Sequence, residues 1–226
     1  MPMPEDSLFF GFKQTMTKEQ EEYVDSIFDN QLTIVNAKAG TGKTTLAVAA
    51  ARLLGMKLVY IFSPVEEKKM GFRPGSQVEK EREYIAPLIG ALIEIGENPN
   101  KVVFNEDLAR DPKVGKQMIE WEKSGVCWCY PRSDTFARGI NISNRFVIID
   151  ECQNFTKSQL RKVLTRIHDD CKVVMIGHTL QCDLPDPSTS GFQDYIDLFS
   201  TKTDYAKICS LNKNFRGVLA QDADSI

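Results

Sequence analysis

Short runs of apolar and β-branched residues alternate along the chain with longer stretches whose apolar positions recur at helical spacing. Several of the short runs are apolar on both faces, which is typical of strands buried between two helical layers. The runs predict strands at 32–37, 57–64, 101–104, 126–130, 145–150, 172–177 and 206–211. The intervening stretches predict helices at 18–28, 44–54, 78–95, 114–123 and 157–167, the last with Thr156 as N-cap. This alternation predicts an α/β fold in which a mainly parallel sheet lies between two helical layers, a three-layer αβα arrangement.

The 226 residues contain no internal repeat and no low-complexity linker. We therefore expect a single domain over 1–226, with residues 1–16 as an N-terminal extension. Residues 66–80 break the alternation, because they are charged and rich in turn residues just after a predicted strand. Ligands of open α/β sheets gather beyond the carboxyl ends of strands, so this segment is either an active-face loop or a solvated surface loop.

The composition is ordinary for a soluble globular protein, with 42% hydrophobic and 26% charged residues. No apolar run approaches the roughly 20 residues that span a bilayer, and the N-terminus lacks the basic start and apolar stretch of a secretory signal. We expect a cytoplasmic protein without a membrane partner. The net charge of −3 argues against a uniformly basic surface but leaves local basic patches open.

Six cysteines lie scattered along the chain, at 127, 129, 152, 171, 182 and 209. A domain of this size does not need disulfides, so we expect reduced thiols. Cys127 and Cys129 alternate as on a strand, and no second half-site accompanies them. Ordinary strand cysteines are therefore favoured over a structural zinc site.

One segment between a predicted strand and a predicted helix matches the phosphate-binding Walker A pattern, with alanine in the first glycine position. We expect ATP to be bound by Ala37, Lys38, Ala39, Gly40, Thr41, Gly42, Lys43, Thr44 and Thr45. The strand-loop-helix context disfavours a chance glycine-rich turn.

Each residue type in this segment has a physical use. Gly40 and Gly42 allow the backbone to curl so that successive N–H groups point at phosphate oxygens, and the helix N-terminus adds its positive dipole. Lys43 is expected to reach the β- and γ-phosphates, and the Thr44 hydroxyl to ligate Mg²⁺.

Two adjacent acids end the apolar strand predicted at 145–150. Asp150 is the candidate for the Mg²⁺ shell, together with Thr44. Glu151 is the candidate general base that orients and deprotonates the attacking water. The alternative, that both acids are turn or cap residues, is weakened by the Walker A segment upstream.

Beyond these parts the chain resembles the PhoH-like family of P-loop ATPases, which are similar to the RecA-like motor core of superfamily 1 helicases. The resemblance runs from Thr17 to about Arg216 as a stand-alone single-domain form. It is carried, in order, by TKEQEEYVDSI, AKAGTGKTTLA, SPVEEKKMGFRPGSQVEK, ARG, IIDECQNFT, LTRI and GHTLQCDLP.

The resemblance implies further roles at matching positions. Gln20 would contact the adenine edge, and Gln181 would sense the γ-phosphate, with Gln153 as a second glutamine near the acids. For both Gln153 and Gln181 a surface side chain or a turn role is the alternative. Arg216 is the preferred arginine finger, in cis or from a neighbouring subunit, since LNKNFRG also resembles the arginine motif of superfamily 1 helicases.

Arg138 and Arg166 lie in other matching segments, and for any of these arginines a surface ion pair is the alternative. The chain departs from the family pattern at Ser63, Ile140 and His178. His178 replaces the usual acid, and it is either a turn residue or a hydrogen-bonding imidazole. We expect the ATPase core to survive these changes.

The resemblance implies that ATP hydrolysis drives the binding or remodelling of single-stranded nucleic acid, with RNA as the preferred candidate. It also implies that the protein forms a homo-oligomer, a hexameric ring. Phe72 beside Arg73 and Phe136 beside Arg138 are aromatics that could stack on bases, although Phe72 could equally hold its own loop. The alternative function is a nucleotide-dependent switch or partner-binding ATPase without helicase activity. Such a unit could be bacterial or phage-encoded, and in the second case it would act in the host cytoplasm.

Overall fold

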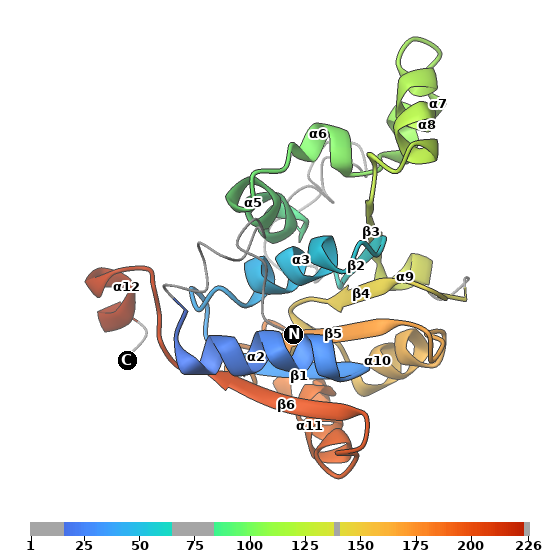
Figure 1. Ribbon diagram of the computed structural model, residues 1–226. Helices are drawn as coiled ribbons and strands as arrows, with labels where there is room; N and C mark the ends of the chain where they lie inside the picture. Colours follow the sequence, from blue (N-terminus) through green and yellow to red (C-terminus); the bar gives the residue numbers. More distant parts are fainter. Residues whose placement is uncertain (1–15, 65–83, 138–140, 224–226) are drawn as a thin grey trace.

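The protein is described here from a computed structural model, in which residues 16–64, 84–137 and 141–223 are described. Within these ranges six strands form one sheet in the order β3-β2-β4-β5-β1-β6, and every neighbouring pair is parallel (Figure 1). The strands are β1 (Leu32–Ala37), β2 (Leu58–Phe62), β3 (Cys129–Ser133), β4 (Phe146–Ile149), β5 (Lys172–Gly177) and β6 (Ala206–Leu211). The predicted α/β class with a parallel sheet is confirmed.

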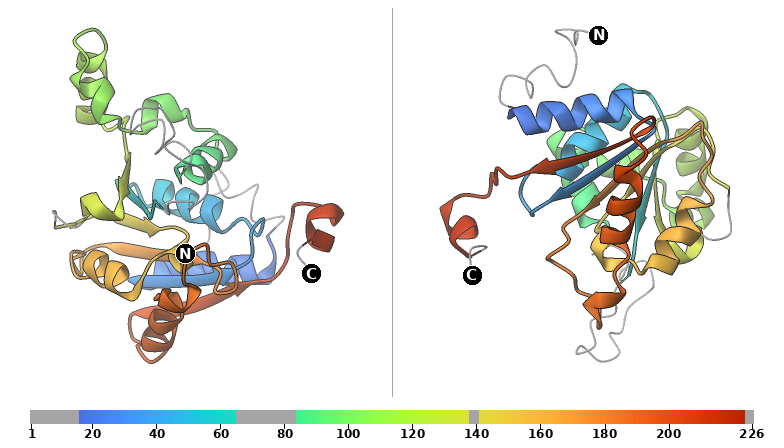
Figure 2. Two further views of the ribbon diagram at one scale, coloured as in Figure 1. Left: turned by 180° about the vertical axis from the view of Figure 1, so that it is seen from behind. Right: turned by 90° about the horizontal axis from the view of Figure 1, so that it is seen from below.

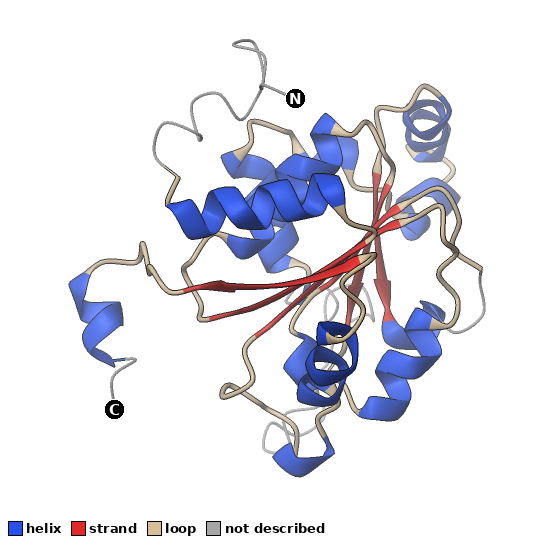
Figure 3. Cartoon of the chain, turned by 60° about the horizontal axis from the view of Figure 1, so that its bottom comes forward, coloured by secondary structure: helices blue, strands red, loops and turns tan. Residues whose placement is uncertain are grey.

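Helices cover both faces of the sheet (Figure 3). One face packs against α2 (Lys18–Asp29), α3 (Lys43–Leu53) and α5 (Ala86–Glu94), and the other against α10 (Lys157–Leu164) and α11 (Phe192–Ser200). The shorter elements are α6 (Pro99–Val102), α7 (Glu106–Arg110), α8 (Gly115–Lys123), α9 (Asp134–Ala137), α12 (Val218–Ala223) and the 3₁₀ turns η1 (Cys152–Asn154) and η2 (Pro187–Thr189).

The strands bury apolar side chains on both faces because successive residues point to opposite sides. In β1, Val35 joins the core beneath α2 and α3, and its neighbour Ile34 joins the core beneath α10 and α11. Each such fully buried side chain contributes about 1.5–3 kcal/mol. Two hydrophobic layers therefore hold the sheet in place, which fixes the positions of the loops at its edges.

Five of the predicted strands are confirmed, with shifts of one or two residues at their ends. The strand predicted at 101–104 is wrong, because Lys101 and Val102 form the end of α6 and Val103 makes only an isolated bridge to Cys129. Asn98 caps α6 with its side chain and Pro99 occupies the first turn, so helix-start signals prevail over the β-branched run. The strand predicted at 126–130 lies later, as β3, where Pro131 is tolerated because β3 is an edge strand.

The predicted helices are confirmed where they are described. Thr156 caps α10 with a complete capping box, although α10 ends at Leu164, three residues earlier than predicted. Of the helix predicted at 78–95, the described part is α5. Residues 66–80 and nearly all of the N-terminal extension lie outside the described residues.

Two parts of the chain project from the layered body. The α7–α8 pair stands off the β3 side, as Figure 1 and the left view of Figure 2 show, and α12 lies beyond the carboxyl end of β6 in both views of Figure 2. Over the described ranges, no helix has the length and apolar character needed to cross a bilayer.

Candidate nucleotide-binding site

The loop between β1 and α3 curls at the carboxyl edge of the sheet, where two glycines adopt left-handed backbone. Gly40 has φ +78° and Gly42 has φ +82°. A Cβ at Gly40 would stand 2.6 Å from both Arg216 Cγ and Asn214 Oδ1. Glycine is therefore required at position 40 by backbone conformation and by close approach together. The loop precedes the N-terminus of α3, as the phosphate-binding interpretation requires.

Helix α2 holds this loop from behind. The Gln20 amide Nε2 donates to the Thr41 carbonyl at 3.0 Å, and the Tyr23 hydroxyl donates to the Lys43 carbonyl at 3.1 Å. The Gln20 Oε1 accepts from the Thr17 N–H at 3.0 Å in a capping box. Gln20 is 8% exposed, so its amide is mainly engaged in shaping the loop. Its predicted contact with adenine stays a prediction.

The other loop residues divide into those facing the loop interior and those facing away. Lys43 Nζ donates to the Lys38 carbonyl at 3.2 Å. The ammonium therefore lies at the loop that is predicted to hold the phosphates. The Thr45 hydroxyl donates to Glu94 Oε2 on α5 at 2.6 Å. The side chain of Thr45 therefore points to α5, and only its backbone is left for the predicted nucleotide contact. Ala37 ends β1.

Asp150, at the carboxyl end of β4, lies beside the helix that follows the loop. Thr44 Oγ1 donates to Asp150 Oδ2 at 3.3 Å, Tyr60 OH donates to the same oxygen at 2.5 Å, and the Glu151 N–H donates to Oδ1 at 2.9 Å. Burial raises the pKa of Asp150 to about 6, the negative charge of Glu151 adds to the rise, and the Tyr60 hydrogen bond and the Lys43 charge oppose it. The structure brings Thr44 and Asp150 together as predicted from the sequence.

Glu151 combines an unusual backbone with an exposed side chain. Its φ of 52° and ψ of 47° are left-handed, a conformation that costs a residue with a Cβ about 1 kcal/mol or more. Its carboxylate Oε2 accepts from Gln153 Nε2 at 2.5 Å. The neighbouring Gln153 amide therefore holds the exposed Glu151 carboxylate in one position.

Gln153 connects the ends of two strands. Its Nε2 is bonded to Glu151, and its Oε1 accepts from the His178 backbone N–H, just beyond β5, at 3.0 Å. A Cβ at Gly177 would stand 2.8 Å from this oxygen, so glycine makes room for the amide. Gln153 is 2% exposed. The structure thus places Gln153, named second after Gln181 by the sequence, in contact with the candidate base.

Gln181 lies in the turn that follows β5. Its backbone N–H donates to the His178 carbonyl at 3.1 Å, and its side chain is exposed. The same turn is held against η1, where Asn154 and Asp183 exchange two hydrogen bonds, of 3.0 and 2.8 Å. The turn therefore stands near the acids, and the sensor role of Gln181 stays a prediction.

Arg216 lies against its own chain's phosphate loop. The Phe215 N–H donates to the Gly40 carbonyl at 2.8 Å, and Glu19 of α2 accepts two 2.8 Å hydrogen bonds from Asn212. These contacts hold the segment after β6 on the loop, so Arg216 lies beside the phosphate loop of its own chain. Its role as an arginine finger stays a prediction.

Arg166 is at the opposite edge of the sheet, where its carbonyl accepts from the Ile142 N–H at 2.8 Å, ahead of β4. A helix that follows a parallel strand returns to the amino edge, which is why the LTRI segment does not reach the site. The backbone of Arg166 therefore lies away from the phosphate loop of its own chain. Arg138 lies outside the described residues.

Tyr60 is a site residue that was not predicted from the sequence, and its hydroxyl donates to Asp150. In the sequence Tyr60 is one more apolar position of β2, and only the pairing of β2 with β4 brings the two residues together.

Five of the six cysteines are buried, and burial raises the pKa of the Cys127 and Cys129 thiols. Over the described ranges no group of three or more His, Cys, Asp or Glu side chains is placed to hold a metal ion. Mg²⁺ that is shared with phosphates needs only one or two carboxylates, so Asp150 with the Thr44 hydroxyl remains a fitting donor set.

The chain matches the PhoH-like protein family over residues 14–222. It is 32% identical over 188 residues to a PhoH-like protein of Mycobacterium tuberculosis strain H37Rv, covering 80% of this chain and 48% of that protein. It is 32% identical over 187 residues to Protein PhoH of Escherichia coli K12, with the same coverage, and 30% identical over 202 residues to Protein PhoH2 of Bacillus subtilis, covering 85% and 42%. The chain spans about half the length of these curated relatives or somewhat less.

Two solved structures are similar in fold. The large terminase of the thermophilic bacteriophage D6E has a TM-score of 0.49 at 13% identity, covering 86% of this chain and 45% of that chain. The Pif1 helicase of Candida albicans has a TM-score of 0.45 at 17% identity, covering 93% and 42%. At such identities a likeness concerns the fold alone. The P-loop NTPase fold predicted from the sequence is confirmed by the parallel sheet and by the strand-loop-helix geometry described above.

Proposed function

This chain belongs to the PhoH-like protein family, and we propose that it is an Mg²⁺-dependent ATPase that acts on single-stranded nucleic acid. RNA is the preferred candidate for that nucleic acid. The observation that carries the ATPase proposal is a convergence at one edge of the sheet. The glycine-curled loop, the Lys43 ammonium and the Thr44–Asp150 pair come from separate elements and meet there. Only a phosphorylated ligand would use all of these groups together.

The binding step uses the backbone first. N–H groups of the loop and of the first turn of α3 would cradle the β- and γ-phosphates of ATP, with the helix dipole adding positive potential. Lys43 would exchange its bond to the Lys38 carbonyl for the phosphate oxygens. Thr44 and Asp150 would hold Mg²⁺, which when bound supplies positive charge against the phosphate oxygens. Gln20 would contact the base with its remaining amide N–H.

The hydrolytic step is assigned to Glu151. Its carboxylate would take a proton from water as the water oxygen forms a bond to the γ-phosphorus and the bond to the β–γ bridging oxygen breaks, releasing ADP and phosphate. Gln153 would act as a positioning residue, because it holds the Glu151 carboxylate in the present geometry. Arg216 would neutralise charge on the transferred group, and Gln181 would report the presence of the γ-phosphate.

A nucleic-acid partner and a homo-oligomer complete the proposal. A motor of this kind closes its cleft between two walls, and the described residues contain one such core, so a neighbouring subunit in a hexameric ring would supply the second wall. The proposed site of action is the cytoplasm. These parts are supported by the family resemblance.

ATP turnover measured with and without single-stranded RNA tests the proposal. We expect RNA to raise the rate severalfold at about 50 mM salt and less at about 200 mM, because phosphate contacts weaken as salt rises. Single-stranded DNA of the same sequence and a duplex are the comparisons, and Glu151→Gln gives the background from contaminating ATPases. Turnover that no nucleic acid alters at either salt concentration contradicts the nucleic-acid proposal and leaves the ATPase proposal standing.

A nucleotide-dependent switch is the second candidate, favoured by one contact. The Phe215 N–H is bonded to the Gly40 carbonyl, and the chain continues from Phe215 into α12, where Val218 is 73% exposed and Leu219 86% exposed. A change in the loop on nucleotide binding could therefore move α12. Under this alternative, amide hydrogen exchange over 212–223 differs between the ATP-analogue and ADP states while RNA has no effect on turnover.

A further inference from the structure

A cavity of about 230 Å³ lies along the outer strands of the sheet, away from the phosphate loop. Tyr130 and Arg132 of β3 line it, and they pair in register with Val59 and Ile61 of β2, so they share one face of the sheet. Lys57, just before β2, and Arg145, just before β4, close its amino edge. From Arg145 to Asp150 the chain runs the length of β4, about 16 Å at 3.3 Å per residue. The cavity is therefore separate from the ATPase site.

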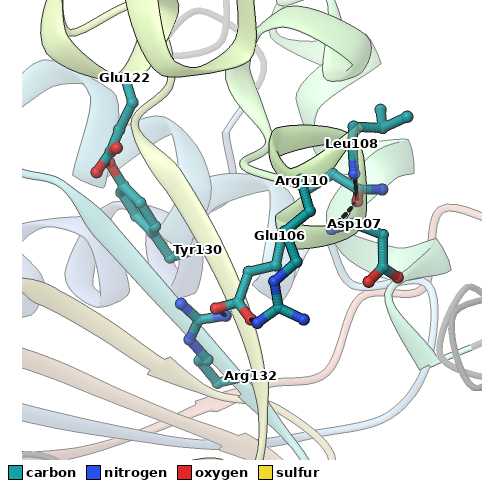
Figure 4. A network of polar contacts seen from close by, with 8 residues as sticks. Glu106, Asp107, Leu108, Arg110, Glu122, Tyr130 and Arg132 are labelled. Atoms are coloured by element: carbon teal, nitrogen blue, oxygen red, sulfur yellow. Dashed lines mark hydrogen bonds and ion pairs between the residues drawn. The ribbon is translucent and has the colours of Figure 1, made fainter. Parts of the chain in front are cut away.

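Basic groups outnumber acidic ones around this cavity. Its lining contains three cations, Lys57, Arg132 and Arg145, and a single carboxylate, Glu122. Arg132 is bonded to Glu106 at 2.8 Å, and Figure 4 shows this carboxylate between Arg132 and Arg110.

Lys57 and Arg145 have no carboxylate partner within the part of the chain that the structure describes. The Lys57 ammonium lies over the Tyr130 ring, 5.5 Å from its centroid, and Arg145 Nη1 donates to the Asn144 carbonyl at 2.9 Å. Both contacts orient a cation without neutralising it. Asn141 and Ser143 add polar side chains to the same wall.

A second cavity, of about 160 Å³, adjoins the first through Lys57. It is also lined by Arg52 and by Trp128, which is 5% exposed. The Trp128 indole N–H has no acceptor among the described residues. Arg52 is paired with Glu97 at 2.6 Å, so the Trp128 indole N–H is the donor left for a ligand here. This donor and the unneutralised Lys57 beside it fit a ligand made of acceptors with negative charge.

We propose that the Lys57–Arg145 cavity is a phosphate-binding site, and that the phosphate belongs to the backbone of a single-stranded nucleic acid. The size of the cavity supports a part of a larger ligand, because pockets that enclose whole small ligands usually measure about 300–1,000 Å³. Arginine suits phosphate oxygens through its planar set of donors, and lysine through its point charge. That the phosphate belongs to a single-stranded nucleic acid rests on the proposed function. That the ligand is a phosphate rests on the cavity alone.

Binding of a labelled single-stranded RNA oligonucleotide tests this site. The double variant Lys57→Gln/Arg145→Gln should weaken binding roughly five- to tenfold at about 50 mM salt. The slope of log affinity against log salt should become shallower by about 0.7, since the two cations share one phosphate and one lost phosphate contact removes about 0.7. The single variant Lys57→Arg, which keeps both positive charges, should bind RNA with most of the wild-type affinity. The matched control is Lys202→Gln/Lys207→Gln, which removes the same charge from exposed positions near β6.

Calorimetric titration with inorganic phosphate identifies the source of the phosphate. The double variant should lose one phosphate site that the control variant keeps, and melting temperatures verify that each variant is folded. If the double variant loses this phosphate site but binds RNA as the wild type does, the ligand is a free phosphorylated molecule and the nucleic-acid assignment is wrong. Unchanged affinity, salt slope and phosphate stoichiometry in the double variant, when the wild type binds RNA, overturn the site and leave the proposed function standing. If the wild type binds no RNA, the proposed nucleic-acid partner fails, and the phosphate titration alone decides the cavity.

Discussion

The two ends of β4 differ in how their polar groups are satisfied. Left-handed backbone stands just outside each end, at Asn144 with φ 49° and at Glu151 with φ 52°. Asparagine adopts this conformation readily, whereas glutamate does so at a cost. At the carboxyl end, Asp150 and Glu151 both accept hydrogen bonds from their own chain. At the amino end, the cation of Arg145 has no carboxylate partner among the described residues.

This difference separates chemistry from association. A network of hydrogen bonds that is anchored on the buried Asp150 and Gln153 fixes positions before a ligand arrives, as a catalytic site requires. An excess of oriented but unneutralised cations fixes little and mainly attracts anions. Changes at the carboxyl end of β4 should therefore affect turnover and folding, and changes at the amino end should affect binding of a polyanion.

The largest expected effect is that of Glu151→Gln on ATP hydrolysis. Turnover should fall at least about 100-fold, because the amide cannot accept the proton of the attacking water. Nucleotide affinity should be retained, since Lys43 and the loop are unchanged. A steady-state ATPase assay and a fluorescent-nucleotide titration measure the two quantities. Glu120→Gln on the exposed side of α8 is the matched control, and unchanged turnover in Glu151→Gln would remove it as general base.

A smaller effect is expected from Gly40→Ala, which tests how strictly the loop geometry is fixed. The left-handed conformation costs an alanine about 1–2 kcal/mol, and its Cβ would meet Arg216 and Asn214. We expect ATP affinity to fall by roughly 10-fold or more, as measured by nucleotide titration. Gly90→Ala is the control, because it lies in α5 with nothing within 4 Å of the added Cβ. It should raise stability by up to about 1 kcal/mol. Equal affinities for the two variants would contradict the constraint at Gly40.

The smallest effect concerns Asp150 and pH in the absence of nucleotide and metal. Because the pKa of Asp150 is raised to about 6, the folded state holds a proton that the unfolded state has already lost. Stability from this group is therefore fully present below the unfolded pKa near 3.8 and is lost as pH rises through about 6. Asp150→Asn should raise the free energy of unfolding at about pH 8 by about 1–3 kcal/mol, and the gain should disappear near about pH 4.

Thermal or urea unfolding across pH measures this difference, with Asp197→Asn on the exposed face of α11 as the control. A destabilised Asp150→Asn protein at about pH 8 would mean that the charged carboxylate is stabilised in its site. The same variant should hydrolyse ATP poorly, so stability and activity would change in opposite directions.

Local sequence patterns were enough to predict the parallel sheet, the phosphate loop and the pairing of Thr44 with Asp150. These features depend on local patterns. Buried strands are apolar on both faces, Gly40 and Gly42 satisfy a backbone requirement, and Asp150 ends an apolar strand. Where a local pattern was ambiguous, as in the β-branched run at 101–104, a cap and a proline gave a helix in place of the predicted strand.

Contacts between residues far apart in the chain depend instead on the order of the strands in the sheet. Tyr60 reaches Asp150 because β2 pairs with β4. Gln153, which follows β4, reaches the end of β5 because β4 pairs with β5. Arg216 reaches Gly40 because β6 lies beside β1. The same order places Arg166 and the basic cavity at the opposite edge. Pairing order is a property of the whole sheet, set by which crossovers bury both helical layers at once, and no local spacing in the sequence contains it.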